Sequence, residues 1–398
     1  MKIFVVNCGS SSIKFQLFSM ENEAVLAKGI VERVGTEEAF MKIKYSGQEF
    51  KSNIPAMDHS QGLAVVLEKL ASEELGIISS IDEIQGVGHR VVHGGEDVKE
   101  SVIINDSVMQ VIDKNTQLAP LHNPANRMGI EAAMKAMPNV PQVAVFDTAF
   151  LSTLPEKAYR YAVPTKWYED FGVRKYGFHG TSHRYVSLKA AELLGKPAEE
   201  LNLITCHLGG GCSMTAVQNG KAIDHSMGMT PLDGLIMGTR SGTIDPAIAF
   251  YMMNQGMTAD QVEKALNKES GLLGVSELSN DMRDLLGAYD EGNEKAILAI
   301  EMFVHSMVKH IGSYYTLMPS VDAIVFTGGV GENSRKFRRK VCEGLAPLGV
   351  VHAEERNQVV IRGKTGQISA DNSKPPVWII ATDEELMIAR DTQELVAK

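Results

Sequence analysis

Residues 4–15 read FVVNCGSSSIKF, an apolar run that predicts a buried strand but is interrupted by an asparagine, a cysteine, a glycine and three serines. Glycine weakens a strand interior and serine adds no apolar burial, so the interruption costs stability. A turn of glycine and serine lets backbone N–H groups converge on an anion, and a lysine adds a compact positive charge. We therefore predict a phosphate-binding hairpin with Ser10, Ser12 and Lys14 as donors.

A second stretch repeats this pattern half a chain later. Residues 3–29 and 203–226 each contain an apolar strand, a polar residue, a Gly/Ser turn, an alternating strand, a polar turn and a third short strand. The similarity is open to two interpretations. It is either a coincidence between two glycine-rich hairpins or the mark of a duplicated domain, in which each half offers one phosphate-binding hairpin to a shared cleft.

A third glycine-rich segment, DAIVFTGGVGEN at 322–333, follows a strongly apolar run. It lacks the G-x-G-x-x-G spacing of a dinucleotide fold, because Ser334 occupies the last glycine position. The only GKT tripeptide has Gln358 where a Walker P-loop needs its first glycine. One such loop is more often a plain tight turn, but three at strand ends favour a nucleotide-binding cleft.

Length and composition restrict the class of protein. A chain of 398 residues is longer than one hydrophobic core usually supports, which predicts two domains. The net charge of −10, without a basic block, argues against nucleic acid as a partner. No apolar run is long enough for a signal peptide or a membrane span. The four cysteines show no C-x-x-C spacing, so we expect a reduced cytoplasmic protein.

Strand-like runs alternate with helical patterns along the chain, which predicts an α/β protein. One helix is expected to start with Asn123 as N-cap and to end at Pro138, and another to close on Gly195. A long helix is expected over 294–319, and the last helix is predicted to begin with a capping box from Thr382 to Glu385.

Two arginines, a histidine and an aspartate stand in motifs that suit phosphoryl transfer: Arg90 in GHRVVHGGE, Arg240 in MGTRSGTIDP, His179 in KYGFHGTSH and Asp147 in VAVFDTAF. Rigid guanidinium groups can neutralise the charge on a transferring phosphoryl group, and one of them can hold a carboxylate in a fork. Asp147 lies in an apolar run and needs a cation, a donor or solvent. Each arginine could equally belong to a structural ion pair.

The histidines offer a different class of function, a metal-dependent hydrolase. His89 and His93 are four residues apart, but in a strand such residues lie about 13 Å from each other. The H-E-x-x-H pattern is absent. A zinc site is therefore disfavoured, and His93, His183 and His207 are expected to be structural.

Ten motifs stand in the order found in the acetate kinase (acetokinase) family: NCGSSSIK, GHRVVHGGE, APLHNPAN, VAVFDTAF, YGFHGTSH, ITCHLGGGCS, DHSMGMTPLDGLIMGTRSGTIDP, ESGLLG, VFTGGVGEN and TDEELMIARDT. The chain resembles this family from residue 3 to about 392, with no large gap. The resemblance implies two duplicated ribonuclease-H-like (actin-like ATPase) α/β domains with a nucleotide cleft between them. It places residues 1–148 and 383–398 in one lobe and 149–382 in the other, which would carry a dimer interface.

The family's activity is the reversible, direct transfer of the γ-phosphoryl group of MgATP to acetate, giving acetyl phosphate and ADP. By resemblance, Arg90 holds the acetate carboxylate, and Asp147, His179 and Arg240 complete the catalytic residues. The methyl pocket would be lined by Val92, Leu121, Phe178 and Pro231. Asn7 and Glu384 would place the magnesium ion, for which manganese is an alternative, although acids at a helix start are also favoured by the helix dipole alone. The expected nucleotide-binding residues are Lys14, Ser10, Ser12, His207, Leu208, Gly209, Gly210, Gly211, Asp281, Met282, Arg283, Gly329, Val330, Gly331, Glu332 and Asn333.

Asp147 matches the position that the family assigns as acid/base. Acetate is already ionised at neutral pH, so it needs no base to remove a proton. We therefore expect Asp147 to orient an arginine or a magnesium-bound water instead. Gly210 and Asp383 depart from the family, since asparagine is common at both positions.

Within the class, propionate and butyrate kinases are the alternatives, because a methylene or two is worth only about 1–3 kcal/mol of discrimination. A sugar kinase would leave Arg90 without a purpose. An ATP-driven clamp of the chaperone type would need a separate substrate-binding domain, for which 398 residues leave little room. We expect a cytoplasmic homodimer with acetate and ATP as partners, which closes about hinges near residues 148 and 382.

Overall fold

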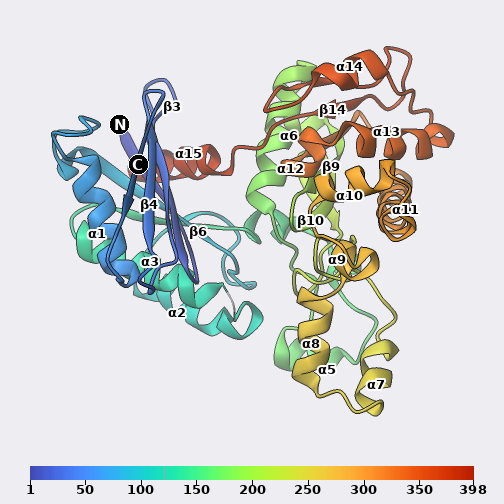
Figure 1. Ribbon diagram of the computed structural model, residues 1–398, viewed down its shortest axis with the longest axis horizontal. Helices are drawn as coiled ribbons and strands as arrows, with labels where there is room; N and C mark the ends of the chain where they lie inside the picture. Colours follow the sequence, from blue (N-terminus) through green and yellow to red (C-terminus); the bar gives the residue numbers. More distant parts are fainter. Residues whose placement is uncertain (121) are drawn as a thin grey trace. The chain divides into compact units, whose positions relative to one another are not determined.

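The computed structural model describes residues 1–120 and 122–398. The chain forms two compact units: unit 1 comprises Met1–Phe150 with Asp383–Lys398, and unit 2 comprises Leu151–Thr382. Each unit is an α/β domain built on one mixed sheet (Figure 1). The predicted α/β class is therefore confirmed.

The sheet of unit 1 has eight strands in the order β5-β4-β3-β2-β1-β6-β8-β7. Strands β1 to β5 form an antiparallel meander, β6 runs parallel to β1, and β8 runs parallel to β6. The strands are β1 (Lys2–Gly9), β2 (Ser12–Ser19), β3 (Ala24–Glu32), β4 (Phe40–Tyr45), β5 (Gln48–Asn53), β6 (Ile84–Val91), β7 (Val102–Ile103) and β8 (Gln142–Phe146).

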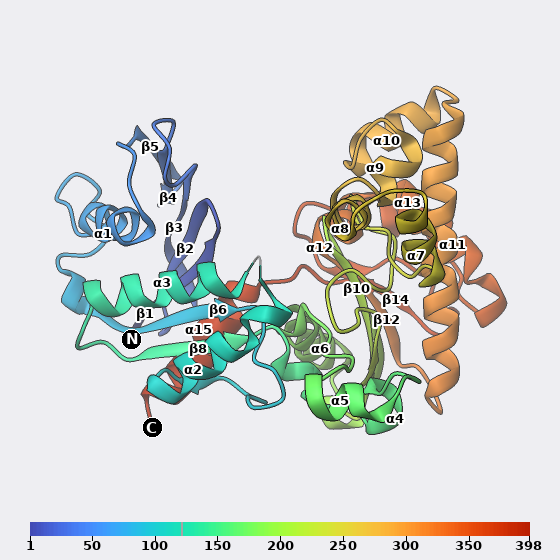
Figure 2. The same cartoon turned by 90° about the horizontal axis from the view of Figure 1, so that it is seen from below.

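Helices cover both faces of this sheet (Figure 2). α1 (His59–Leu70) and α3 (Asn123–Ala136) pack over a core that includes Val87, and α2 (Asp106–Lys114) lies beside α3. α15 (Glu384–Val396) packs on the opposite face, against β1, β6 and β8. It lies so close to β6 that a Cβ atom on Gly88 would stand 2.5 Å from the side chains of Ile388 and Thr392. The sheet therefore needs glycine at this point.

The sheet of unit 2 repeats the same connections, in the order β11-β10-β9-β12-β14-β13. β9, β10 and β11 form an antiparallel meander, β12 runs parallel to β9, and β14 runs parallel to β12. These five strands correspond to β1, β2, β3, β6 and β8, so the sequence repeat reflects a duplicated domain. The strands are β9 (Asn202–Leu208), β10 (Cys212–Gln218), β11 (Lys221–His225), β12 (Ala323–Thr327), β13 (Gly366–Gln367) and β14 (Val377–Ile379).

In unit 2, α6 (Gly180–Leu194) and α11 (Glu294–Leu317) lie on opposite sides of the sheet (Figure 2). The other helices are α4 (Glu156–Tyr159), α5 (Thr165–Phe171), α7 (Ala247–Asn254), α8 (Ala259–Lys268), α9 (Gly271–Ser276), α10 (Met282–Asp290), α12 (Gly328–Asn333), α13 (Arg335–Gly344) and α14 (Glu354–Val359). Within the residues that the structure describes, no helix has the length and apolar character that crossing a membrane requires.

Two of the four helix predictions are confirmed: α6 ends at a left-handed Gly195, and α11 covers most of 294–319. The other two predictions each place the N-cap one residue away from the observed position. The cap of α3 is His122, because the side chain of Asn123 bonds the backbone of His93 instead. The cap of α15 is Asp383, whose Oδ1 accepts the N–H of Leu386 at 2.9 Å.

Candidate active site

Arg90 and Asp147 lie in unit 1, at the carboxyl ends of the neighbouring parallel strands β6 and β8. Arg90 Nε donates to Asp147 Oδ1 at 2.9 Å, and Nη2 donates to Oδ2 at 2.7 Å. The Asp147 side chain is buried, whereas 25% of the Arg90 side chain remains exposed. The pKa of Arg90 is raised by the charge of Asp147, so this guanidinium stays charged. Asp147 therefore fixes the orientation of Arg90, and the rest of the guanidinium is left for a ligand.

Two buried asparagines of α3 position the loop that follows Arg90. Asn126 accepts the N–H of Val92 at 3.1 Å and donates to the carbonyl of Cys8 at 3.0 Å. Asn123 bonds both the N–H and the carbonyl of His93. Neither role was predicted from the sequence, although both residues stand in the APLHNPAN motif.

Glu384 begins α15 in the same unit. Its Oε2 atom is buried and accepts no hydrogen bond from the residues that the structure describes. Burial raises the pKa of this carboxyl to about 7, and the negative charges of Asp147 and Glu385 add to the shift, while Arg90 and Lys14 oppose it. A buried carboxylate oxygen without a donor is suited to a cation.

The donor set available for a metal ion is small. Among residues 1–120 and 122–398, no group of three His, Cys, Asp or Glu side chains could hold one. Mg²⁺ commonly uses only one or two carboxylates and completes its shell with water and substrate phosphates. Glu384 and the amide of Asn7, on the adjacent strand β1, fit such an ion.

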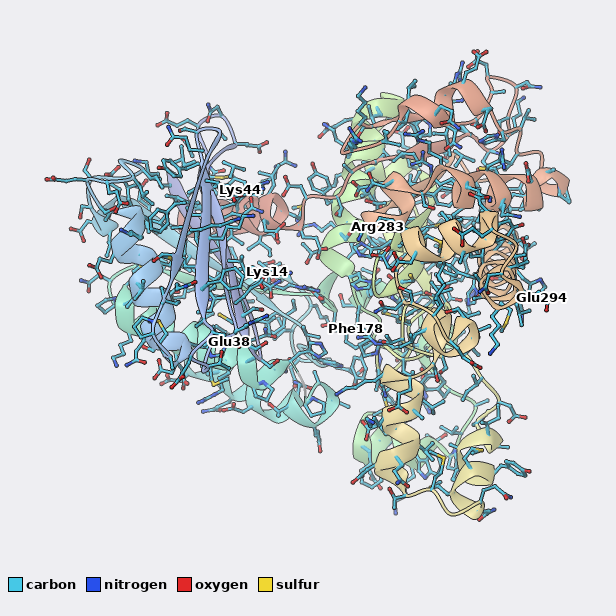
Figure 3. The ribbon with its side chains drawn as sticks, in the orientation of Figure 1. Lys14, Glu38, Lys44, Phe178, Arg283 and Glu294 are labelled. Carbon is cyan, nitrogen blue, oxygen red and sulfur yellow. The ribbon has the colours of Figure 1, made fainter. Side chains whose placement is uncertain are left out.

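The predicted hairpin joins β1 to β2, with Asn7 paired to Lys14 across the two strands. Lys14 is exposed and has no ion-pair partner in the described part of the chain (Figure 3). Ser10 is exposed at the turn and Ser12 is half-buried. The strand is held tightly against α3, because a Cβ atom on Gly129 would lie 2.4 Å from Cys8 Sγ. The hairpin, whose backbone is held against α3, thus offers hydroxyls and an ammonium group that has no ion pair among the described residues.

His179 lies in unit 2, immediately before α6, in a left-handed backbone conformation with φ 58°. Its Nδ1 atom is 2.8 Å from Ser213 Oγ, and its ring stacks on that of His207 with centroids 4.3 Å apart. A left-handed conformation is unfavourable for a residue with a Cβ atom, and such strain is often found at functional sites. The hydrogen bond between His179 and Ser213 and the stacking on His207 hold the His179 ring in place.

Two further histidines bond the residues that surround His179. His183 bonds Thr205 through Nδ1 at 2.7 Å and Ser213 through Nε2 at 2.8 Å. His225 Nε2 accepts the N–H of Phe178 at 3.1 Å, so its other nitrogen carries the proton and donates to Thr215. Burial holds the pKa of His183 and of His225 well below the usual range, so both rings are neutral.

Arg240 lies beside the second glycine-rich hairpin. Its Nη1 atom donates to the Pro231 carbonyl at 3.4 Å and contacts the sulfur of Met237 at 3.8 Å. A Cβ atom on Gly211 would stand 3.4 Å from Nη1 and 3.3 Å from His179 Cε1, so the hairpin, His179 and Arg240 meet at one point. Arg240 has no carboxylate partner among the described residues, and burial lowers its pKa. A partly buried guanidinium without an acid favours an anionic ligand.

A pocket of about 750 Å³ opens next to this point in unit 2. Eight of the predicted nucleotide-binding residues line it: Gly209, Gly210, Asp281, Met282, Arg283, Gly329, Val330 and Asn333. Arg283 extends from the start of α10, where it pairs with Asp281 (Figure 3). Four lining residues were not predicted from the sequence, namely Asn280, Leu286, Ser334 and Arg335. Asn280, Ser334 and Arg335 lie within two residues of a predicted one, and Leu286 lies one turn beyond Arg283 on α10, so proximity in sequence is the only signal that could have indicated them.

Five other predicted nucleotide-binding residues of unit 2 do not line this pocket: His207, Leu208, Gly211, Gly331 and Glu332. Glu332 instead accepts the N–H groups of Gly328 and Thr382, at 3.1 and 3.3 Å. The fully buried Arg338 donates to the carbonyls of Gly331 and Glu332. These contacts determine the shape of the α12 turn that borders the pocket.

The predicted methyl-pocket residues are distributed over both units. Val92 is buried in unit 1, whereas Phe178 is buried and Pro231 half-buried in unit 2. Leu121 lies outside the described residues.

The acetokinase family model matches residues 2–390. An acetate kinase of Carboxydothermus hydrogenoformans is 54% identical over 398 residues, covering 100% of this chain and 99% of the relative. An acetate kinase of Thermotoga maritima is 52% identical over 400 residues, with coverages of 100% and 99%. Among solved structures, an acetate kinase of Porphyromonas gingivalis matches with a TM-score of 0.95 at 45% identity, and a propionate kinase of Francisella tularensis with 0.92 at 41%; each match covers 99% of both chains.

Proposed function

The chain belongs to the acetokinase family and is a kinase that transfers phosphate to a carboxylate, and we propose that its residues act as follows. The reaction is the reversible transfer of the γ-phosphoryl group of ATP to acetate, which gives acetyl phosphate and ADP. The observation that carries the residue assignment is the Arg90–Asp147 pair, because it presents a fixed guanidinium at the ends of two strands.

Arg90 would bind the acetate carboxylate through the N–H groups that Asp147 leaves free. A guanidinium has five N–H donors, and Asp147 uses the edge formed by Nε and Nη2. The remaining end, formed by Nη1 and the second proton of Nη2, suits a bidentate carboxylate. Acetate would thereby be oriented by a guanidinium that is itself held in place, because turning Arg90 away would break its two charge-assisted hydrogen bonds to Asp147.

The nucleotide would occupy the 750 Å³ pocket of unit 2, with the adenosine between α10 and the α12 turn. Arg240 and His179 would contact the transferring phosphoryl group, since they meet at Gly211 and Arg240 has no carboxylate partner among the described residues. Donors fixed before the reaction stabilise the charge that develops in the transition state. The transfer is direct and in line, and it needs no general base because acetate is already an anion.

Asn7 and Glu384 would hold a magnesium ion. When bound, the ion neutralises the phosphate oxygens and lowers the charge that opposes attack by a carboxylate. The buried and donor-free Oε2 atom of Glu384 supports this assignment. Lys14, with Ser10 and Ser12, would contact the phosphates from the hairpin of the same unit.

Acetate is the preferred acceptor over propionate in this proposal. Relatives at 51–54% identity over nearly the whole chain are acetate kinases, whereas the propionate kinase is 41% identical. One methylene group is worth only about 1–3 kcal/mol in an apolar pocket, so we expect propionate to react more slowly rather than not at all.

The test is to trap the acyl phosphate with hydroxylamine in the presence of MgATP and equimolar acetate, propionate or butyrate. The wild type should give hydroxamate chiefly from acetate, Arg90→Ala should lose it, and Arg127→Ala should retain it. Arg127 is a matched control because it is a half-exposed arginine of unit 1, on α3. ATP hydrolysis without hydroxamate from any acid would instead indicate an ATP-driven clamp.

A homodimer in the cytoplasm is the remaining part of the proposal, and it rests on the family. Unit 2 carries large apolar side chains on α7 that suit such an interface: Phe250 is 64% exposed and Tyr251 is 62% exposed. Exposed aromatic side chains of this kind are enriched at protein interfaces.

A further inference from the structure

Unit 1 has a pocket of about 310 Å³ on the meander half of its sheet. Four of its lining residues are lysines: Lys14, Lys28, Lys42 and Lys44. Its polar lining is completed by Asn7, Gln16 and Glu385. Figure 3 shows Lys14 and Lys44 on the same side of the strands, away from α1. The proposed reaction gives no role to three of these lysines.

Strand periodicity places the four lysines on one face. Side chains alternate along a strand, and Ile13 and Phe15, the neighbours of Lys14, belong to the core under α1 and α3. In the register of the sheet, Lys28 of β3 lies directly opposite Lys44 of β4. The lysine face is therefore the face of β2, β3 and β4 that the helices α1 and α3 do not cover.

The positive charges on this face are only partly compensated. Glu49 of β5 pairs with Lys42 at 2.9 Å, with Lys51 at 3.0 Å and with Lys44 at 3.6 Å. Lys14 and Lys28 have no ion pair within 4 Å among residues 1–120 and 122–398, although the charge of Lys28 acts on the nearby carboxyl of Asp383, and Glu385 is the only acid in the lining. Like charges directly opposite each other destabilise a sheet. An anionic ligand would remove this repulsion.

Protection of a sheet edge does not account for these lysines. Edge strands commonly carry lysine to prevent pairing with other chains, and that explanation is sufficient for Lys51 on the edge strand β5. Lys14 and Lys28 lie on β2 and β3, which have hydrogen-bonded strands on both sides. Their ammonium groups gather at a pocket instead of a free edge.

We propose that this pocket binds a linear oligophosphate. Neighbouring strands are about 4.8 Å apart, so the lysines of β2, β3 and β4 spread over roughly 10 Å. A single phosphate would reach only part of this row, whereas a chain of phosphoryl groups can follow it from Lys14 to Lys44. Lysine ammonium groups are compact point charges that bind phosphate without a strict angular requirement. Two sources share this chemistry, a free inorganic chain and the triphosphate tail of a nucleotide.

The first test measures binding of inorganic tripolyphosphate to the intact chain by calorimetry, without metal ions, nucleotide or acetate. We expect the double variant Lys28→Gln/Lys44→Gln to raise the Kd about tenfold, since two exposed ion pairs are lost. Lys135→Gln should change the Kd by less than about twofold. Lys135 is an exposed lysine of the same unit on α3, so it provides the same change in charge away from the pocket. An unchanged Kd in the double variant would overturn the proposal.

The second test uses thermal unfolding, which also shows whether the variants fold. Without ligand, the double variant should unfold at a higher temperature than the wild type, because the repulsion between Lys28 and Lys44 is removed. Tripolyphosphate should raise the unfolding midpoint of the wild type more than sulfate does at the same ionic strength. An equal effect of sulfate would mean that the lysines only attract counterions non-specifically, and this would refute the proposal. If ATP binding is weakened in the double variant as much as tripolyphosphate binding, the nucleotide tail is the source; if only tripolyphosphate binding is weakened, the free chain is. Neither test depends on the kinase reaction.

Discussion

Asp147 holds Arg90 by one edge of its guanidinium, through two hydrogen bonds of 2.9 and 2.7 Å, and leaves the other end open. The carboxylate that stands at the acid/base position of the family is thus already engaged with a permanent cation. A group that holds a guanidinium in a fixed orientation acts through geometry, whereas a general base acts through its pKa. The two roles can be separated by experiment.

We expect Asp147→Asn to lower kcat/KM for acetate by about 100-fold, because a misplaced catalytic group costs roughly this factor. The amide cannot accept both N–H groups of Arg90. The pH–rate profile should keep the acidic limb of the wild type, since no proton transfer to Asp147 is lost. Disappearance of that limb in the variant would show that Asp147 is a base. Asp113→Asn, at an exposed position of α2, is the control and should leave both readouts unchanged.

Glu384→Gln should make the metal-free protein more stable at pH 8. The pKa of Glu384 is raised to about 7 in the folded state from 4.5, so the folded protein bears the cost of a buried charge above pH 7. This cost is up to about 3 kcal/mol of unfolding free energy, and it disappears as the pH falls from 7 to 4.5 and the carboxyl takes up its proton.

Urea unfolding of wild type and variant between pH 4.5 and pH 8 would measure the difference. A difference in unfolding free energy between the two proteins that does not change with pH would contradict the raised pKa of Glu384. Glu131→Gln, at an exposed position of α3, is the control and should give no such pH dependence. Magnesium with ATP should stabilise the wild type but not Glu384→Gln.

Ser213→Ala should reduce kcat about tenfold with little change in KM for acetate. Ser213 bonds His179 at 2.8 Å and His183 at 2.8 Å, so its removal takes one hydrogen bond from the His179 ring and leaves a buried nitrogen of His183 without a partner. The second effect should cost about 1–3 kcal/mol of stability. Steady-state kinetics and thermal unfolding would report the two effects separately, with Ser313→Ala on the exposed side of α11 as control. An unchanged kcat would mean that stacking on His207 is enough to position His179.

Gly88→Ala should destabilise unit 1 by about 1–3 kcal/mol, because the added methyl group would overlap Ile388 and Thr392 of α15. Gly312→Ala provides the opposite case. Gly312 lies within α11 with nothing in 4 Å of a built Cβ atom, and alanine there should stabilise the helix by about 0.5–1 kcal/mol. Chemical unfolding would measure the free energy of unfolding of both variants. Equal stability of Gly88→Ala and the wild type would show that α15 can move away from the sheet.

Phe250→Asp should convert the proposed homodimer into a monomer. The side chain is 64% exposed in the single chain, and a buried aspartate at an interface would be strongly unfavourable. Light scattering coupled to gel filtration would measure the mass, with Phe171→Asp, which changes a 67% exposed phenylalanine on α5, as control. A wild-type protein that elutes as a monomer would reject the dimer itself.

The parts of the fold that depend on local pattern were predictable from the sequence. The two glycine-rich hairpins, the glycine end of α6 and the extent of α11 follow from short-range signals such as turn residues and helical periodicity. Residues 3–29 and 203–226 form corresponding meanders of the two sheets, as the repeat suggested.

The features that were missed depend on partners distant in the sequence. Arg338 stands in the basic run SRKFRRK, which is typical of a solvated helix, yet it is fully buried and donates to five backbone or side-chain groups. Asn123 was expected to cap its own helix but bonds His93, thirty residues away in the chain. A sequence pattern records neighbours on the same element and carries no information on which backbone groups of another strand need a donor.

The attachment of α15 to the first sheet has a consequence for protein synthesis. The glycines of β6 leave a place on the sheet that α15 fills, and α15 is synthesised after the whole of unit 2. Unit 2 can fold while translation continues, since its whole sequence precedes them. Unit 1 must wait with one face of its sheet uncovered until α15 has been made, so a ribosome that stalls within unit 2, or a chain truncated before residue 384, would expose that face to chaperones and proteases.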